Sequence, residues 1–103
     1  MKVMSVSEFD AWQKASGERV FILDTDNNEW HPAQPFHICL RFPKVIVSAF
    51  LDRIAFRDGN TILCLDRVKE VHMYDTYEMV GTVFDVICCP TVGNPMTWRF
   101  LAD

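Results

Sequence analysis

Glycine and proline interrupt this sequence at short intervals, and their positions constrain the fold more than any other feature. All four Gly and all five Pro fall where a hydrophobic pattern breaks off. They stand at Gly17, Pro32, Pro35, Pro43, Gly59, Gly81, Pro90, Gly93 and Pro95. Because both residue types favour turns, the segments between them must be short. Many short segments separated by turn residues predict a β-rich fold.

The clearest helix signals lie in residues 5–16. Ser5 followed by Glu8 fits a capping box, in which each side chain bonds the backbone amide of the other residue. The apolar residues that form one stripe are Val6, Phe9, Ala11 and Trp12. Gly17 is expected to end the helix. Because this helix is short and only half apolar, it must pack against the rest of the chain.

Alternating hydrophobicity indicates strands in most of the remaining sequence. Between Phe36 and Phe42 every second residue is apolar, and His37, Cys39 and Arg41 occupy the other face, which is typical of a half-buried strand. Similar signals lie in residues 19–24, 61–65, 68–73, 82–89 and 96–101. We expect a kink or bulge at Asp66-Arg67, between two of these segments.

Residues 44–57 carry two conflicting signals. Their apolar spacing fits a helix that follows Pro43 and ends before Gly59. Against a helix, the β-branched run 45–47 prefers a pleated strand, and Asp58-Gly59-Asn60 is a strong hairpin signal. We predict strands and keep the helix as the alternative. The hairpin would place on one face Ile54, Phe56, Thr61, Leu63 and Leu65.

These elements together predict one domain over residues 1–103, of the α+β class and predominantly antiparallel β. One N-terminal helix precedes about six or seven strands, which we expect to form a roll or a partly open barrel. A pleckstrin-homology-like arrangement is one architecture of this kind, by analogy of element order alone. The alternative fold has residues 44–57 helical.

Charge and hydropathy exclude some classes of function. The 103 residues include 10 Lys and Arg against 14 Asp and Glu, a net charge of −4, so the chain lacks the positive surplus on which nucleic-acid binding depends. The longest strongly apolar run, Val45–Leu51, is far shorter than the ~20 residues of a membrane helix. No signal-peptide core follows the N-terminus. We therefore expect a cytoplasmic protein that binds neither nucleic acid nor membranes.

The four cysteines are expected to be reduced, buried residues of the core. Cys39, Cys64, Cys88 and Cys89 all lie inside apolar segments, where free Cys acts as a small hydrophobic side chain. No C-x-x-C pair is present, so the spacing does not indicate zinc. Adjacent Cys88 and Cys89 would point to opposite faces of a strand.

A calcium-loop pattern begins at Asp24. Asp24, Asp26 and Asn28 match the first oxygen ligands of such a loop. However, Glu29 stands where the loop needs Gly, and Pro35 stands where it needs a bidentate Glu. An Asx-rich turn explains the same residues, because these side chains bond their own backbone. Calcium binding is thus a weak candidate function.

A reactive cysteine is the second candidate. His37 and Cys39 share one face of the expected strand, and a His near a thiol is the arrangement that activates a cysteine. Alternate residues of a strand lie about 6.5–7 Å apart, too far for an easy direct hydrogen bond. The third, orienting group of a catalytic triad is not identifiable from the sequence.

Asp85 interrupts the apolar segment TVFDVICC. Strand alternation places it away from Phe84 and Val86, on the other face of the strand. It lines a pocket, where burial would raise its pKa, lies on the solvated face of the sheet, or pairs with an arginine. The candidate arginines are Arg53, Arg57 and Arg99.

Apolar residues exceed what a small core can hold. Val45–Leu51 is apolar on both faces, and a domain of this size buries only about 60–68% of its chain surface. Exposed apolar patches mark interaction sites. We expect an interface between copies of the chain that contains Val45, Val47, Phe50 and Trp98.

This surplus and the absence of catalytic motifs favour a non-enzymatic protein-interaction or assembly module. We expect a homo-oligomer in a bacterial or phage-like setting. We also expect no cofactor, because no phosphate loop, nucleophile elbow or zinc-protease motif is present. The first alternative is a small enzyme or ligand carrier with a pocket around His37, Cys39 and Asp85. The second is calcium binding.

Overall fold

The computed structural model describes residues 1–23, 40–74 and 82–102, which contain one α-helix and nine strands. In chain order the elements are β1 (Lys2–Met4), α1 (Val6–Ala15), β2 (Phe21–Leu23), β3 (Leu40–Phe42), β4 (Lys44–Ser48), the 3-10 turn η2 (Ala49–Leu51), β5 (Arg53–Asp58), β6 (Thr61–Leu65), β7 (Val68–Met73), β8 (Thr82–Cys88) and β9 (Met96–Ala102). The α+β class with antiparallel sheets is confirmed. The strand count exceeds the six or seven expected, partly because β1 is too short to leave an alternating pattern.

The strands form two antiparallel sheets. The larger sheet has the order β1-β7-β8-β9-β2-β3, and the smaller has the order β4-β5-β6. Every adjacent pair is antiparallel. The chain passes from the larger to the smaller sheet at Pro43 and returns through Asp66 and Arg67. Over the described ranges the strands form no closed barrel, so the expected roll is an open one.

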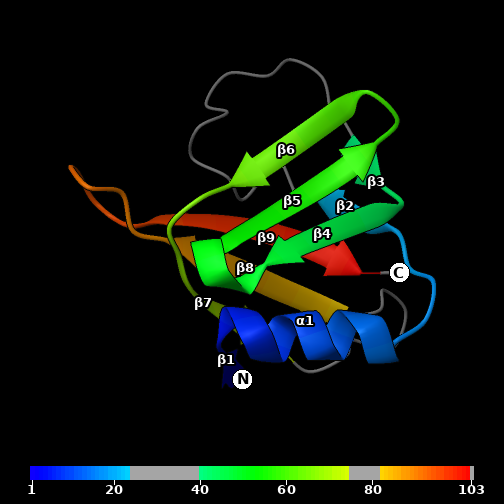
Figure 1. Ribbon diagram of the computed structural model, residues 1–103. Helices are drawn as coiled ribbons and strands as arrows, with labels where there is room; N and C mark the ends of the chain where they lie inside the picture. Colours follow the sequence, from blue (N-terminus) through cyan, green and yellow to red (C-terminus); the bar gives the residue numbers. More distant parts are fainter. Residues whose placement is uncertain (24–39, 75–81, 103) are drawn as a thin grey trace, which may run out of the picture.

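The smaller sheet and α1 cover the same face of the larger sheet (Figure 1). Phe9 of α1 packs on Phe84 of β8, with ring centroids 5.2 Å apart. Phe56 of β5 stacks on Phe100 of β9 at 4.1 Å. Phe84 and Phe100 are direct cross-strand partners, and their ring centroids are 5.4 Å apart. The helix and the smaller sheet therefore pack on the same pair of neighbouring rings.

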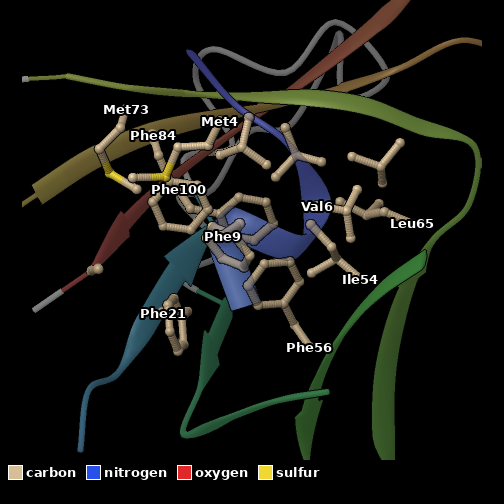
Figure 2. Packing of buried hydrophobic residues seen from close by; sticks show 14 of the residues in the cluster. Met4, Val6, Phe9, Phe21, Ile54, Phe56, Leu65, Met73, Phe84 and Phe100 are labelled. Carbon is tan, nitrogen blue, oxygen red and sulfur yellow. The ribbon is translucent and has the colours of Figure 1, made fainter. Parts of the chain in front are cut away.

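Phenylalanine dominates the core between the two layers. Figure 2 shows the rings of Phe9, Phe56 and Phe100 converging between the helix and the two sheets. The ring centroid of Phe56 also lies 5.5 Å from that of Phe21 and 6.0 Å from that of Phe42. Aromatic pairs at these distances add stabilisation beyond the area they bury. The core therefore depends on one connected set of rings that belong to elements distant in the sequence.

The helix begins and ends close to where the sequence predicts. Ser5 is the N-cap, and the capping box is complete, because Ser5 Oγ accepts from the Glu8 amide and Glu8 Oε1 accepts from the Ser5 amide, each at 3.1 Å. The first orphan amides of the helix are satisfied in this way. The helix ends at Ala15, and Gly17 follows with φ +74°. Glycine adopts this left-handed conformation at no steric cost.

Residues 44–57 form two strands joined by η2, so the strand prediction is confirmed and the helical alternative is wrong. Val45 and Val47 point toward the core, whereas Ile46 between them is exposed. This two-residue alternation is that of a pleated strand. The apparent helical spacing arises because the outward positions are apolar as well.

The hairpin of β5 and β6 places the expected residues together on one face. Asp58 pairs with Thr61, which leaves Gly59 and Asn60 as a two-residue loop. Gly59 has φ +57°, the sign that the first loop residue of a type II′ turn requires. Ile54, Phe56 and Leu65 are buried. The turn residues thus fix the register that places these side chains on one face of the hairpin.

The expected kink at Asp66-Arg67 is present. Arg67 has φ +55°, and its carbonyl accepts a 2.9 Å bond from the Cys89 amide. The register against β8 then shifts between Val68 and Glu70. Because of this bulge, Val68 and Val71 both face the core although three positions separate them.

Replacing the ring that joins the two sheets should be strongly destabilising. We expect Phe56→Ala to lower the free energy of unfolding by about 3–5 kcal/mol, since it removes a fully buried ring and leaves a cavity. Phe50→Ala is the matched control, because Phe50 is 97% exposed, and its effect should stay within about 0.5 kcal/mol. Urea unfolding followed by circular dichroism measures both. Equal midpoints for the two variants would contradict the assignment.

Candidate functional site

Asp85 lies on the face of the larger sheet opposite the phenylalanine core. It is only 3% exposed, although its strand neighbours Phe84 and Val86 fill the other face. Arg99, directly across on β9, donates from Nε to Oδ1 at 2.8 Å and from Nη2 to Oδ2 at 2.9 Å. The Tyr74 hydroxyl donates to Oδ2 at 2.8 Å. Of the three candidate arginines, Arg99 is the partner.

This cluster has the features of a structural ion pair. A bidentate Arg–carboxylate pair is among the stronger polar contacts in proteins, and here both carboxylate oxygens are bonded. The hydrogen bond to Asp85 raises the pKa of Tyr74, and the same carboxylate raises the pKa of Arg99. The Arg99 guanidinium also lies 5.4 Å from the centroid of the Tyr74 ring. These contacts hold β7, β8 and β9 together.

The proposed pocket around Asp85 is only partly within the described residues, because His37 and Cys39 lie outside them. His72 is the cross-strand partner of Asp85 on β7, but its Nε2 bonds Glu70 Oε1 at 2.9 Å. A catalytic pocket at this place therefore stays a prediction.

The calcium candidates Asp24, Asp26 and Asn28 also lie outside the described residues. Within residues 1–23, 40–74 and 82–102, no three His, Cys, Asp or Glu side chains come close enough to hold a metal ion. Calcium binding is thus neither supported nor contradicted by the described part of the chain.

The cysteines differ from one another more than expected. Cys88 is buried in the core, and burial raises the pKa of its thiol to about 11. Cys89 is half-buried, and Cys39 lies outside the described ranges. The prediction that Cys64 is buried is wrong, because it lies on the outward side of β6 and is exposed. Alternation along β6 sends Leu63 and Leu65 inward and leaves Cys64 to solvent.

The outer face of β4-β5-β6 is the side of the smaller sheet that points away from the core. The strand register brings together there Lys44, Ile46, Ser48, Arg53, Ala55, Arg57, Ile62 and Cys64. Ile46 is 51% exposed and Ile62 is 57% exposed. Phe50 and Leu51, in the turn at one end of this face, are exposed as well. Two exposed isoleucines thus lie on this face, and two more exposed apolar side chains lie in the turn at its end.

This finding changes the membership of the expected interface. Val45, Val47 and Trp98 are partly buried and pack against the core, so they are poor candidates for a docking surface. Phe50 alone of the four expected residues is strongly exposed. Ile46 and Ile62 are not among the four expected residues, although Ile46 lies inside the segment Val45–Phe50 that the interface was expected to use. The hairpin register could have identified them, since it places them opposite the face of Ile54 and Phe56.

The charges on the outer face are concentrated at one end. Lys44 of β4 and Arg57 of β5 are direct cross-strand partners, although like charges in that position repel. Arg57 Nε donates to the Gly59 carbonyl at 2.9 Å rather than to an acid. Arg53, at the other end of β5, is paired with Asp66. The excess positive charge therefore lies beside Ile46 and Ile62, at the Lys44 end.

Breaking the Asp85 cluster should cost stability. We expect Asp85→Asn to lower the free energy of unfolding by about 2 kcal/mol, less than for a fully buried pair, because the Arg99 side chain is 35% exposed and can reach water. Asp66→Asn, which breaks the exposed pair with Arg53, is the control and should cost less than about 1 kcal/mol. Chemical denaturation measures both variants. An Asp85→Asn protein as stable as the parent would contradict this role.

Alkaline pH should weaken the fold through Cys88 and Tyr74. Each group has a raised pKa in the folded state, so its contribution is complete below its unfolded pKa and is lost as pH rises through the folded one. For Cys88, a rise from 9.0 to about 11 predicts a loss of about 3 kcal/mol across that window. Urea unfolding at a series of pH values measures this loss. The free energy of unfolding should fall less steeply with rising pH in Cys88→Ala than in the parent, and also in Tyr74→Phe above pH ~10. Cys64→Ala, as the control, should follow the parent; an unchanged slope in Cys88→Ala would contradict the prediction.

Comparisons with known proteins add no further information on the function of these residues. No helix of the described residues is long and apolar enough to cross a membrane. No family model matches the chain, and no match was found among curated proteins or solved structures.

Proposed function

We propose that this protein is a non-catalytic assembly module that binds a second copy of itself through the outer face of β4-β5-β6. The observation that supports this proposal is the exposure of Ile46, Phe50, Leu51 and Ile62 on or beside one sheet face. Exposed apolar patches rimmed by polar residues are typical of protein-interaction sites.

Burial of this face against a partner would remove apolar surface from water without any change in the fold of the chain. The inner face of the same sheet is already occupied, because Ile54, Phe56 and Leu65 fill the core. Ile46, Ala55 and Cys64 form one cross-strand row on the outer side, flanked by Ile62. A row of this kind suits a partner that brings a complementary apolar surface.

Charge makes a second copy a suitable partner. The chain carries a net charge of −4, yet Lys44 and Arg57 lie together at one end of the outer face. All ten Lys and Arg fall in the described ranges, whereas six of the fourteen acids fall in residues 24–39, 75–81 and 103. A second copy carries the same net charge of −4, which favours its approach to this positive end. Contacts between unlike surfaces of identical chains form rings or filaments.

The state of Asp85 supports a function without catalysis. It is the buried charged residue among those described, and both of its oxygens are bonded to Arg99 or Tyr74. A carboxylate committed in this way is poorly placed for acid–base chemistry, which requires the group to reach a substrate proton. The cytoplasmic location and the bacterial or phage-like setting stay predictions from the sequence.

Oligomeric mass tests the proposal directly. In size-exclusion chromatography with light scattering at micromolar concentration, we expect the parent to show a multiple of 11.9 kDa. Ile46→Asp should shift the mass to that of the monomer, because it places an acid in the apolar row. Val92→Asp is the matched control, since Val92 is exposed in the connection between β8 and β9.

Two outcomes would contradict self-assembly through this face. One is a parent protein that is monomeric at every concentration tested. The other is equal dissociation of the Ile46→Asp and Val92→Asp proteins, which would show that any added charge disrupts the assembly.

A further inference from the structure

A groove lies between the end of α1 and the free edge of β4. Its volume is about 720 Å³, and its walls include Gln13 of α1, the connection from Gly17 to Phe21, and residues 43–46. Figure 1 shows α1 on the side of β4 away from β5. An adjoining hollow of about 370 Å³ extends the groove past Lys44 to Arg57.

One wall of this groove is an unpaired strand edge. β4 is the terminal strand of the order β4-β5-β6, so half of its backbone groups point away from β5. Over the described ranges, no backbone hydrogen bond joins residues 44–48 to a strand other than β5. An extended segment could therefore add to the sheet at this edge, with side chains entering the groove alternately.

The same groove carries cations that lack acidic partners. The Arg19 guanidinium lies 5.1 Å from the centroid of the Trp12 ring, which holds it in place, and its buried Nε has no acceptor among the described residues. No ion pair joins Arg19 or Lys44 to an acid in the described part of the chain. Glu18 also lines the groove, so the lining of the two hollows carries three cations against one acid.

We propose that this groove binds an extended acidic peptide segment of a partner protein, which adds as a strand along β4 and places its carboxylates against Arg19 and Lys44. Charge complementarity selects the acidic partner, because neither cation pairs with an acid among the residues that the structure describes. The free edge selects an extended one, because backbone hydrogen bonding needs a strand. The groove shares Lys44 and Ile46 with the outer face. Arg19 distinguishes the two kinds of binding, because it lies in the connection between α1 and β2, outside that face.

Fluorescence anisotropy with defined peptides tests the proposal. The probe is a fluorescein-labelled six-residue peptide of alternating Val and Glu, titrated with the full chain. We expect saturable binding that weakens with salt and is roughly tenfold weaker for Arg19→Gln and for Lys44→Gln, since each loses a charge-assisted bond. Lys69→Gln is the matched control, because it removes one exposed cation of β7 outside the groove and should bind like the parent.

Two further peptides separate charge from strand addition. A Val–Lys peptide should not bind, and a Val–Glu peptide with alternate backbone nitrogens methylated should bind much more weakly. Hydrogen exchange should show protection of residues 44–48 when the unmodified peptide is bound. Equal binding of the methylated peptide would overturn strand addition, and equal binding of the Val–Lys peptide would overturn acidic selectivity.

The oligomeric mass of the same variants distinguishes the two proposals. If Arg19→Gln loses peptide binding but keeps the oligomeric mass of the parent, the result supports peptide binding in the groove. Self-assembly is then judged by the Ile46→Asp experiment alone. A mass that falls in Arg19→Gln, with no peptide binding by the parent, would assign the groove to a second copy and overturn the peptide proposal. Circular dichroism and a melting curve confirm that each variant is folded.

Discussion

The stacking of Phe56 on Phe100 is the contact on which the rest of the structure depends. Its ring centroids are 4.1 Å apart, the shortest distance for an aromatic pair between the two sheets among the described residues. In the described ranges the chain passes between those sheets at Pro43 and at Asp66-Arg67. Phe100 in turn contacts Phe84, which receives Phe9 of α1. The helix and the smaller sheet are therefore held on one face through a single set of rings, and loss of one ring affects every layer.

The other face of the larger sheet is held by polar contacts. Asp85 shares β8 with Phe84 and Val86, so one strand contributes to the aromatic core on one side and to the Arg99 and Tyr74 cluster on the other. Burial of a carboxylate is costly unless its bonds are made. Here they are made by neighbouring strands, so the cluster also favours the correct register of β7, β8 and β9.

The proposed binding surfaces follow from how this core is assembled. The inner face of β4-β5-β6 is occupied by the aromatic core, which leaves Ile46 and Ile62 outward. Within the described residues, β4 is left as a free edge beside α1. Arg19 is fixed on Trp12, whose ring also packs on Phe9. The cation that we propose to bind an acidic segment is thus positioned by the core itself. Both proposals use surfaces that the packing leaves open.

Local features of this protein were determined by its sequence. The capping box at Ser5, the hairpin at Gly59 and the kink at Arg67 depend on neighbouring residues, and alternation divided β5 and β6 into two faces. Tertiary structure decided which face is covered. Ile46 and Val47 are both β-branched and apolar, and Cys64 lies between two leucines, yet only packing against Phe100 and α1 sends one set inward. Arg99 was one of three candidate partners for Asp85 until the strand order placed it opposite. Short-range chemistry is encoded residue by residue, whereas burial depends on elements that are distant in the chain.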